Sequence, residues 1–489
     1  MPAIAYGDAL ALKAAEHPDR PSLTDGTGTL TRAEVDRQTD LAARRLVAAG
    51  AGPDRVVAYT GPNSARLLML AFAIWKAGAI PLPLPERKGP AELGALVGLA
   101  SPAVAVGFAD DVDISAPRLN LDAIFAGEPS DTVEEAGART KRHVASVVRI
   151  GVSGGSTGIS KLISVDAPAL INPAKPWPYG MAADGTHVVA LDLVDGTGFV
   201  SSTAGLATGN HLIITEAFDP AETLRLIAHH RADWLALTPP LMLRIWKLGP
   251  DRRNEHDLSS LRYVTQYSGA AAPWLKRAFI EWFGADRVVE SYGATDSRGN
   301  TWIDGPTWLA HPGAVGRAEN GCEIAIFDVD MRPLPNGVVG DVYIRDLTGR
   351  RNFHYIGIDV QTQPGGWETV GDMGWLDNDG YLHLADRRKD VITTRQGLVF
   401  PSTIEGAIER HDAVRSVVVV GLPGDEGIEE IHAVIDAPYA PVDAASILEF
   451  LGADLSPELL PASIEFVDGP LRDAAGKARR AQLRQERLH

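Results

Sequence analysis

The sequence predicts an α/β protein with a large N-terminal domain and a small C-terminal α+β domain. Two observations support this prediction. Short apolar runs typical of strands alternate with segments of helical periodicity along most of the 489 residues, which is the pattern of layered α/β domains. A charged segment at 386–390 interrupts the alternation, and the chain that follows is long enough for a second compact unit.

The elements of the large domain follow from hydrophobic spacing and breaker residues. The first helix is expected at 33–49, because apolar residues recur there at helical spacing until Ala51-Gly52-Pro53 ends it. Short apolar runs predict strands at 56–59, 79–84, 147–152, 187–193 and 234–237. Further helices are expected at 65–77 and 221–232.

The boundary between the two domains is predicted between residues 386 and 387. A strand-like run at 381–384 precedes the charged residues. Beyond them, the α+β unit is expected to contain helices near 404–409 and 444–451 and strands at 414–420 and 431–435. The prediction is an N-terminal domain over 1–386 and a C-terminal domain over 387–489, and an ordinary loop at 386–390 is the alternative.

Composition excludes several classes of protein. The hydrophobic content of 45% and charged content of 22% are ordinary for a soluble globular chain, and a net charge of −17 argues against a nucleic-acid-binding surface. No apolar stretch reaches the ~18 residues that a membrane span needs, and the first residues lack the basic and apolar segments of a secretory signal. With Cys322 as the single cysteine, neither an internal disulfide nor an ordinary zinc site is expected. Together these features predict a cytoplasmic protein.

The segment Ser153-Gly154-Gly155-Ser156-Thr157-Gly158-Ile159-Ser160-Lys161 is the most informative part of the sequence. Its glycines expose backbone N–H groups, its hydroxyls add short donors, and its lysine supplies a positive charge, so it suits a phosphate group. It has neither the GxxxxGKS/T spacing of P-loop ATPases nor the GxGxxG spacing of dinucleotide folds. Taken alone, it is either a phosphate-binding loop or a plain Gly/Ser-rich turn.

The same segment resembles the phosphate-binding signature of the adenylate-forming superfamily, which includes acyl-CoA synthetases, luciferases and the adenylation domains of peptide synthetases. With Leu162-Ile163 after the lysine, it is most similar to the branch that activates aryl acids. Five further stretches resemble motifs of this superfamily in the same order, namely Ser291–Asp296 (YGxTE), Gly313–Arg317 (GsvGrp), Trp367–Asp372 (GWyrTGD), Asp386–Ile392 (GRxxDxI) and Gly476–Arg480 (GKxxR). The resemblance spans nearly the whole chain.

This resemblance implies a fold and a reaction. The N-terminal domain would contain several sheets, and the C-terminal domain would be a mobile cap with its hinge near Lys389. The implied enzyme is an acyl- or aryl-CoA ligase, which forms an acyl-adenylate from a carboxylic acid and ATP and transfers the acyl group to the thiol of coenzyme A. The implied cofactors are ATP/AMP, Mg²⁺ and coenzyme A. Partners would be a small carboxylic acid and coenzyme A, with a carrier protein and a homodimer left open, and neither nucleic acid nor a membrane is expected.

Catalytic and metal-binding residues are implied by the same motifs. Lys477 would act between the carboxylate and the α-phosphate, Thr295 would donate to the α-phosphate, and Lys389 would lie at the hinge. Asp296 falls where the superfamily carries the acid that helps to hold magnesium. For Lys477 and Lys389 the alternative interpretation is a solvated lysine on the surface.

Binding residues are implied in two sets. Nucleotide and thiol-channel contacts are implied for Ser153, Gly155, Ser156, Thr157, Gly158, Lys161, Gly269, Ser291, Tyr292, Gly293, Asp372, Arg387 and Gly397. Substrate contacts are implied for Asp195, Ser268, Gly269 and Gly293. In the first set, Asp372 would hold the ribose hydroxyls with help from Arg387, and Tyr292 would stack on adenine. The alternatives are a turn residue for Asp372 and a core tyrosine for Tyr292.

Several positions depart from the superfamily pattern. Ser160 replaces a proline, Asp296 is one methylene shorter than the usual glutamate, and Val370 lacks the hydroxyl of the usual threonine. In the loop that lines the thiol channel, Gln396 takes the place of a glycine, and Gly397 comes one position late. These changes bear mainly on the first half of the reaction.

Asp192 and Asp195 stand where many members carry a proline and then a histidine or aromatic residue. An aspartate near position 195 is typical of members that activate amino acids, so Asp195 either pairs with a substrate ammonium group or is a solvent-facing turn residue. Three alternative functions stay open. They are a thioester-forming enzyme that uses a preformed adenylate and has lost ATP-dependent adenylation, a stand-alone adenylation enzyme that loads a carrier protein, and a catalytically silent binding subunit.

Overall fold

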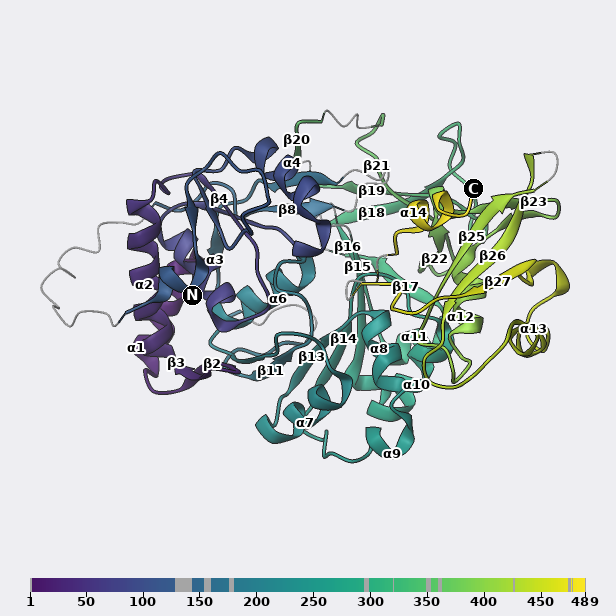
Figure 1. Cartoon of the computed structure of the whole chain (residues 1–489), viewed down its shortest axis with the longest axis horizontal. Coiled ribbons are helices and arrows are strands. Elements are labelled where there is room, and N and C mark those ends of the chain that lie inside the picture. Colours follow the sequence, from purple (N-terminus) through teal and green to yellow (C-terminus); the bar gives the residue numbers. More distant parts are fainter. Residues whose placement is uncertain are drawn as a thin grey trace, which may run out of the picture.

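The computed structural model describes residues 2–127, 143–153, 160–175, 180–293, 299–319, 321–348, 353–358, 363–424, 427–473, 476 and 478–488. These residues form a large N-terminal part with several sheets and a small C-terminal α+β region, so the predicted fold class is confirmed. The N-terminal helices and the C-terminal strands lie at opposite ends of the long axis of the molecule (Figure 1). Within these ranges, no helix has the length and apolar character needed to cross a membrane.

A large mixed sheet forms the centre of the molecule. Its thirteen described strands lie in the order β18 (Cys322–Phe327), β19 (Gly340–Asp346), β21 (Glu368–Leu376), β22 (Leu382–Arg387), β17 (Ala314–Ala318), β16 (Asn300–Asp304), β15 (Val288–Gly293), β14 (Tyr263–Gln266), β13 (Trp234–Leu237), β11 (Thr186–Val189), β12 (His211–Ile214), β2 (Pro21–Asp25) and β3 (Gly28–Thr31). Neighbours from β2 to β15 are parallel, and the pairs from β15 to β18 are antiparallel. Ligands of parallel sheets bind beyond the carboxyl ends of the strands. A ligand site is therefore expected at the edge of the sheet where β11, β13, β14 and β15 end.

Three smaller sheets complete the N-terminal part. They are the parallel sheet of β4 (Val56–Tyr59), β5 (Ile80–Pro83), β6 (Val104–Val106) and β7 (Arg118–Leu119), the antiparallel sheet of β8 (Arg149–Ser153), β9 (Lys161–Val165) and β20 (Phe353–Ile356), and the pair β1 (Ile4–Ala5) and β10 (Leu170–Ile171). Strands β8 and β9 contain the first and last residues of the predicted phosphate-binding segment, Ser153 and Lys161, which pair across the ladder. The strand predicted before this segment is therefore confirmed.

The helices of the N-terminal part surround these sheets. They are α1 (Tyr6–Glu16), α2 (Arg32–Ala48), α3 (Ala65–Lys76), α4 (Pro90–Ala100), α5 (Leu121–Phe125), α6 (Gly196–Ala207), α7 (Pro220–His230), α8 (Pro239–Trp246), α9 (Gly249–Arg253), α10 (Pro273–Phe283) and α11 (Gly305–Ala310), with short 3₁₀ turns η1 (Glu86–Lys88) and η3 (Ala285–Arg287). Helix α2 begins at a capping box between Thr31 and Glu34. Helix α3 is capped by Ser64 and buries every residue except Arg66, as an almost wholly apolar helix must.

One predicted strand, at 187–193, is shorter in the structure. Strand β11 ends at Val189 because the side chain of Asn63 satisfies the following backbone instead of a neighbouring strand. The Asn63 amide nitrogen donates to the Leu191 carbonyl at 3.0 Å, and its carbonyl oxygen accepts from the Leu193 N–H at 2.9 Å. This contact turns the residues after β11 into a loop at the carboxyl edge of the sheet.

The C-terminal region has its own small core. Its elements are η4 (Arg388–Asp390), β23 (Ile392–Thr394), β24 (Gly397–Val399), α12 (Pro401–Ile408), β25 (Ser416–Pro423), β26 (Glu429–Asp436), α13 (Ala444–Gly452), η6 (Pro457–Leu459), β27 (Ser463–Phe466) and α14 (Arg480–Gln485). Buried residues of these elements, including Ile404, Val417 and Ile435, pack on one another. The region contacts the N-terminal part where Lys247 Nζ donates to the His411 carbonyl at 2.7 Å and Trp274 Nε1 donates to the Gly406 carbonyl at 2.9 Å. Strand β22 of the large sheet runs through to Arg387, so the predicted boundary falls at the last residue of a strand, and it stays a prediction.

Candidate active site

A buried carboxylate on a strand of the large sheet is the first element of the site. Asp372 on β21 is 8% exposed. Its Oδ2 accepts a hydrogen bond from the Tyr292 hydroxyl at 2.5 Å, and its Oδ1 lies 2.9 Å from Arg387 Nε. The register of β21 and β22 places Asp372 opposite Arg387, while Tyr292 reaches it from β15. A carboxylate offers about four acceptor positions, so Asp372 has the capacity to accept further hydrogen bonds from ligand hydroxyls.

Tyr292 has a structural contact that the sequence did not reveal. Its side chain is buried at 6% exposure and packs with Val315, Val342 and Leu382. Its hydroxyl is a donor to Asp372, as described above. The core interpretation of Tyr292 thus has direct support from burial, and stacking on adenine stays a prediction.

Predicted substrate residues gather at the carboxyl edge of the parallel strands. Ser268 and Gly269 follow β14, Gly293 is the last residue of β15, and β14 and β15 are parallel neighbours. Ser268 and Gly269 have positive φ angles of 69° and 128°, so the backbone turns sharply there. The structure thus brings these three residues to one edge of the sheet.

A buried ion pair lies beneath this edge. Lys276 on α10 and Glu290 on β15 have side chains that are only 1% and 3% exposed, and Lys276 Nζ lies 3.2 Å from Glu290 Oε2. Gln266 joins them: its amide nitrogen donates to Glu290 Oε1 at 2.9 Å and to the Gly269 carbonyl at 2.8 Å, and its oxygen accepts from Lys276 Nζ at 3.2 Å. Burial raises the pKa of Glu290 and lowers the pKa of Lys276, and their mutual attraction opposes both shifts. The network fixes the carbonyl of Gly269.

Replacing Lys276 by methionine is expected to reduce the free energy of unfolding by about 3–5 kcal/mol, because Glu290 would stay buried without its cation. Glu290 then has a raised pKa in the folded state only, so the loss should grow as the pH rises above the pKa of an unfolded glutamate. Urea unfolding at several pH values measures both effects. The double variant Lys276→Met/Glu290→Gln should recover part of the loss, and a loss below about 1 kcal/mol in the single variant would contradict the account.

Asp195 pairs with a cation that the sequence did not reveal. It lies directly before α6, its side chain is 16% exposed, and its Oδ1 lies 2.5 Å from Arg87 Nη2. Arg87, in η1, also pairs with Asp192 and with Asp473 of the C-terminal region, at 2.8 and 3.0 Å. Burial and the neighbouring Asp195 raise the pKa of Asp192, whereas Arg87 lowers it. Pairing of Asp195 with a substrate ammonium group stays a prediction.

The remaining predicted residues are only partly described. Gly155, Ser156, Thr157, Gly158, Thr295, Asp296 and Lys477 lie outside the described residues. Lys161 Nζ lies 5.7 Å from the centre of the Tyr355 ring, and Ser291 is buried within β15. Lys389 is exposed in η4, and Gly397 is exposed at the start of β24 with a φ of 125°. The motifs did not identify Arg87 or the network around Lys276 as parts of the site. A lysine and a glutamate within apolar runs were the sequence features that could have indicated the buried network.

Comparison with known proteins assigns the family. The sequence profile described as "AMP-binding enzyme" matches residues 10–348. Fatty acid–[acyl-carrier-protein] ligase ScoC of Streptomyces coeruleorubidus is 28% identical over 96% of this chain and 94% of its own length, and a feruloyl-CoA synthase of Amycolatopsis sp is 26% identical over 96% of each chain. The solved structure of the amide bond synthetase McbA from Marinactinospora thermotolerans superposes with a TM-score of 0.76 at 25% identity, covering 98% of this chain and 99% of that chain. This chain therefore belongs to the AMP-binding family of ATP-dependent, adenylate-forming enzymes.

Proposed function

We propose that this enzyme activates a small carboxylic acid as an acyl-adenylate and transfers the acyl group to the thiol of coenzyme A. The observation that carries the proposal is the geometry at Asp372. A buried carboxylate, oriented by Tyr292 and Arg387, is suited to accept charge-assisted hydrogen bonds from the two ribose hydroxyls of a nucleotide. Its strand β21 lies in the same large sheet as β14, the strand that Ser268 and Gly269 follow.

In the first half-reaction, a carboxylate oxygen of the acid attacks the α-phosphorus of ATP, and the bond to pyrophosphate breaks. Two anions must approach each other, so catalysis depends on positioning and on positive charge. Lys477 is proposed to supply that charge between the two groups, and Thr295 to donate to the α-phosphate. Mg²⁺, when bound, would neutralise charge on the departing pyrophosphate, with Asp296 as a ligand.

The remaining phosphate contacts are assigned to the segment between β8 and β9. Ser153, Gly155, Ser156, Thr157 and Gly158 are proposed to surround the β- and γ-phosphates with N–H and hydroxyl donors. Lys161, at the start of β9, is proposed to supply a cation to the same groups. For this role its ammonium group would have to exchange its contact with the Tyr355 ring for a phosphate oxygen.

In the second half-reaction, a thiol attacks the acyl carbon, the bond to the phosphate oxygen breaks, and AMP leaves. Lys389 lies in the short η4 turn that joins the large sheet to the C-terminal region. A hinge needs only a few residues that absorb changes in φ and ψ, and we assign that role to Lys389. Gly397 is assigned to the channel through which the thiol reaches the adenylate.

A carrier protein is the second candidate for the acyl acceptor. A relative that is 28% identical over 96% of this chain is named as a ligase for an acyl-carrier protein, while another, 26% identical, is named as a CoA synthase. Both acceptors would present a thiol to the same acyl-adenylate, so the first half-reaction is common to the two candidates.

The acceptor is tested by supplying one acid, ATP and Mg²⁺ together with coenzyme A, a phosphopantetheinylated carrier protein or a simple amine. The expected result is an acyl-CoA product, detected by mass spectrometry, with AMP release that depends on coenzyme A. An acylated carrier or an amide, formed while coenzyme A stays unmodified, would contradict this part of the proposal and leave the adenylation step intact.

A further inference from the structure

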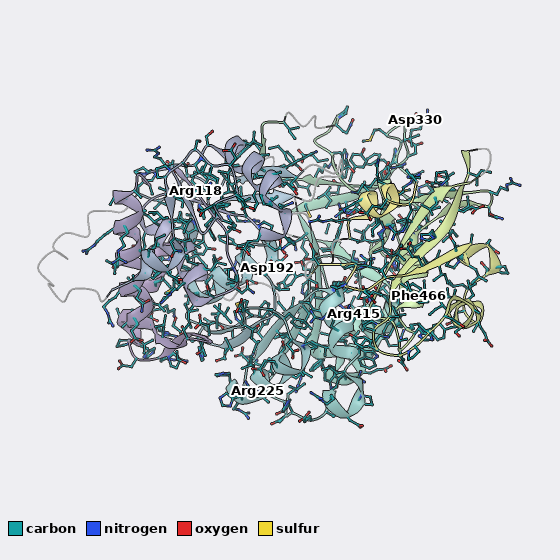
Figure 2. All side chains as sticks on the ribbon, in the orientation of Figure 1. Arg118, Asp192, Arg225, Asp330, Arg415 and Phe466 are labelled. Atoms are coloured by element: carbon teal, nitrogen blue, oxygen red, sulfur yellow. The ribbon has the colours of Figure 1, made fainter. Side chains whose placement is uncertain are left out.

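Arg87 connects the two parts of the molecule through a single side chain. It lies in η1, between β5 and α4, and its guanidinium presents a different nitrogen to each of three carboxylates: Nη2 to Asp195, Nη1 to Asp192 and Nε to Asp473. Asp192 lies near the centre of the molecule (Figure 2). The planar fork of an arginine, unlike the point charge of a lysine, suits such simultaneous pairing.

The backbone of Arg87 provides a second link. Arg479 Nη2 donates to the Arg87 carbonyl at 2.7 Å. In sequence, Asp473 lies four positions before Lys477 and Arg479 lies two positions after it. Through Asp473 and Arg479, the C-terminal region is thus linked to Arg87 at two described residues. Gly476, which directly precedes Lys477, lies against Pro240 at the start of α8, because a Cβ at that glycine would be 3.4 Å from Pro240 Cδ.

The neighbouring residue extends this connection toward the phosphate-binding segment. Lys88 Nζ pairs with Glu92 at 2.9 Å and contacts the hydroxyl of Ser160, which also donates to Glu92. Ser160 is the second-last residue of the predicted phosphate-binding segment, directly before Lys161. The short turn η1 thus contacts Ser160, Asp195 directly before α6, and the C-terminal residues Asp473 and Arg479.

We infer that Arg87 is a positioning residue for adenylate formation: through Asp473 and Arg479 it holds the C-terminal region against η1, the arrangement in which Lys477 is proposed to act. This inference rests on the proposed function and assigns Arg87 no contact with substrate. Asp192 and Asp195 belong to the same N-terminal part as Arg87, so these two ion pairs stay in place when the contact with Asp473 is broken. The contact with Asp473 is the one that can separate. Without Arg87, three carboxylates would repel one another at this junction.

The variants Asp473→Asn and Arg87→Gln are expected to slow adenylate formation by about tenfold, because a small misplacement of a catalytic group is costly. Acyl transfer from supplied acyl-adenylate should change less than about twofold, since Lys477 is not needed there. ATP–pyrophosphate exchange measures the first step and thioester formation the second. The matched control is Asp454→Asn, which removes one partner of an exposed ion pair with Arg410 in the same region; it should alter neither step.

A double-variant cycle and hydrogen exchange complete the test. Arg87→Gln/Asp473→Asn should lose no more activity than Arg87→Gln alone, because both changes break one link. In the full-length protein, amide hydrogens of 470–480 should exchange faster in Arg87→Gln than in the wild type. Equal losses in both half-reactions, additive losses or unchanged amide exchange would overturn the inference. An absence of pyrophosphate exchange in the wild type would instead contradict the proposed function, and the catalytic role of Arg87 with it.

Discussion

Replacing Lys477 by alanine is expected to slow acyl-adenylate formation by about 10²–10³-fold, the usual effect of removing one group that stabilises transition-state charge. The acid and the α-phosphate are both anions, and the lysine is proposed to lie between them. Transfer of the acyl group from supplied adenylate to the thiol should continue at nearly the wild-type rate. Pyrophosphate exchange and thioester formation, assayed separately, measure the two steps.

The control for this variant is Arg410→Ala, which removes a positive charge from the same region. Arg410 is 43% exposed and pairs only with the exposed Asp454 among the ion pairs of the described residues. It should leave both half-reactions unchanged, as exposed pairs contribute little. Equal losses of both half-reactions in Lys477→Ala would show that Lys477 does not have the assigned role.

Replacing Asp372 by asparagine is expected to weaken AMP binding by about 100-fold. Two charge-assisted hydrogen bonds to the ribose hydroxyls would become neutral ones, and each is worth about 1.5–3 kcal/mol. Arg387 would also lose its anionic partner at 2.9 Å. Isothermal titration calorimetry with AMP measures the affinity, and urea unfolding of the same variant reports whether the fold is retained.

Tyr292→Phe is the matched comparison for Asp372→Asn. It keeps the buried ring and removes only the hydroxyl that donates to Asp372 at 2.5 Å. AMP affinity should fall by less than about tenfold, because the carboxylate stays charged and only one neutral donor is lost. If Asp372→Asn folds normally and binds AMP like the wild type, Asp372 does not hold the ribose.

The sequence predicted helices and strands well where apolar spacing and breaker residues mark them locally. Helix α2 was expected within one residue of its observed ends from the helical spacing of its apolar residues and from Ala51-Gly52-Pro53, which follows it. Strand β4 was predicted at its observed bounds as a short apolar run. Each of these signals acts within a few residues.

Features that depend on contacts between distant parts of the chain could not be predicted from the sequence. Strand β11 ends early because Asn63, on a distant part of the chain, satisfies the backbone of Leu191 and Leu193. Motifs predicted Asp372, Arg387 and Tyr292 as site residues, and the structure brings these three together. Their roles, like those of the residues outside the described ranges, stay predictions.

Ion-pair partners were the least predictable feature of the site. Asp195 had two interpretations from the sequence, and neither included Arg87, which lies more than one hundred residues earlier in the chain. A sequence pattern reports charge at a position but not which opposite charge the fold places beside it. The contact between Arg87 and Asp473 therefore depends on how the fold places the C-terminal region next to η1, which the sequence pattern does not report.

ATP–pyrophosphate exchange tests whether this enzyme forms an acyl-adenylate from ATP and a carboxylic acid. The protein is incubated with Mg²⁺, ATP, labelled pyrophosphate and separate pools of aromatic, fatty, polycyclic and amino acids. Exchange is expected in one pool, which would establish adenylate formation and identify the class of acid together. If protein that still binds AMP shows no exchange in any pool, that result would contradict adenylate formation. It would favour an enzyme that receives a preformed acyl-adenylate.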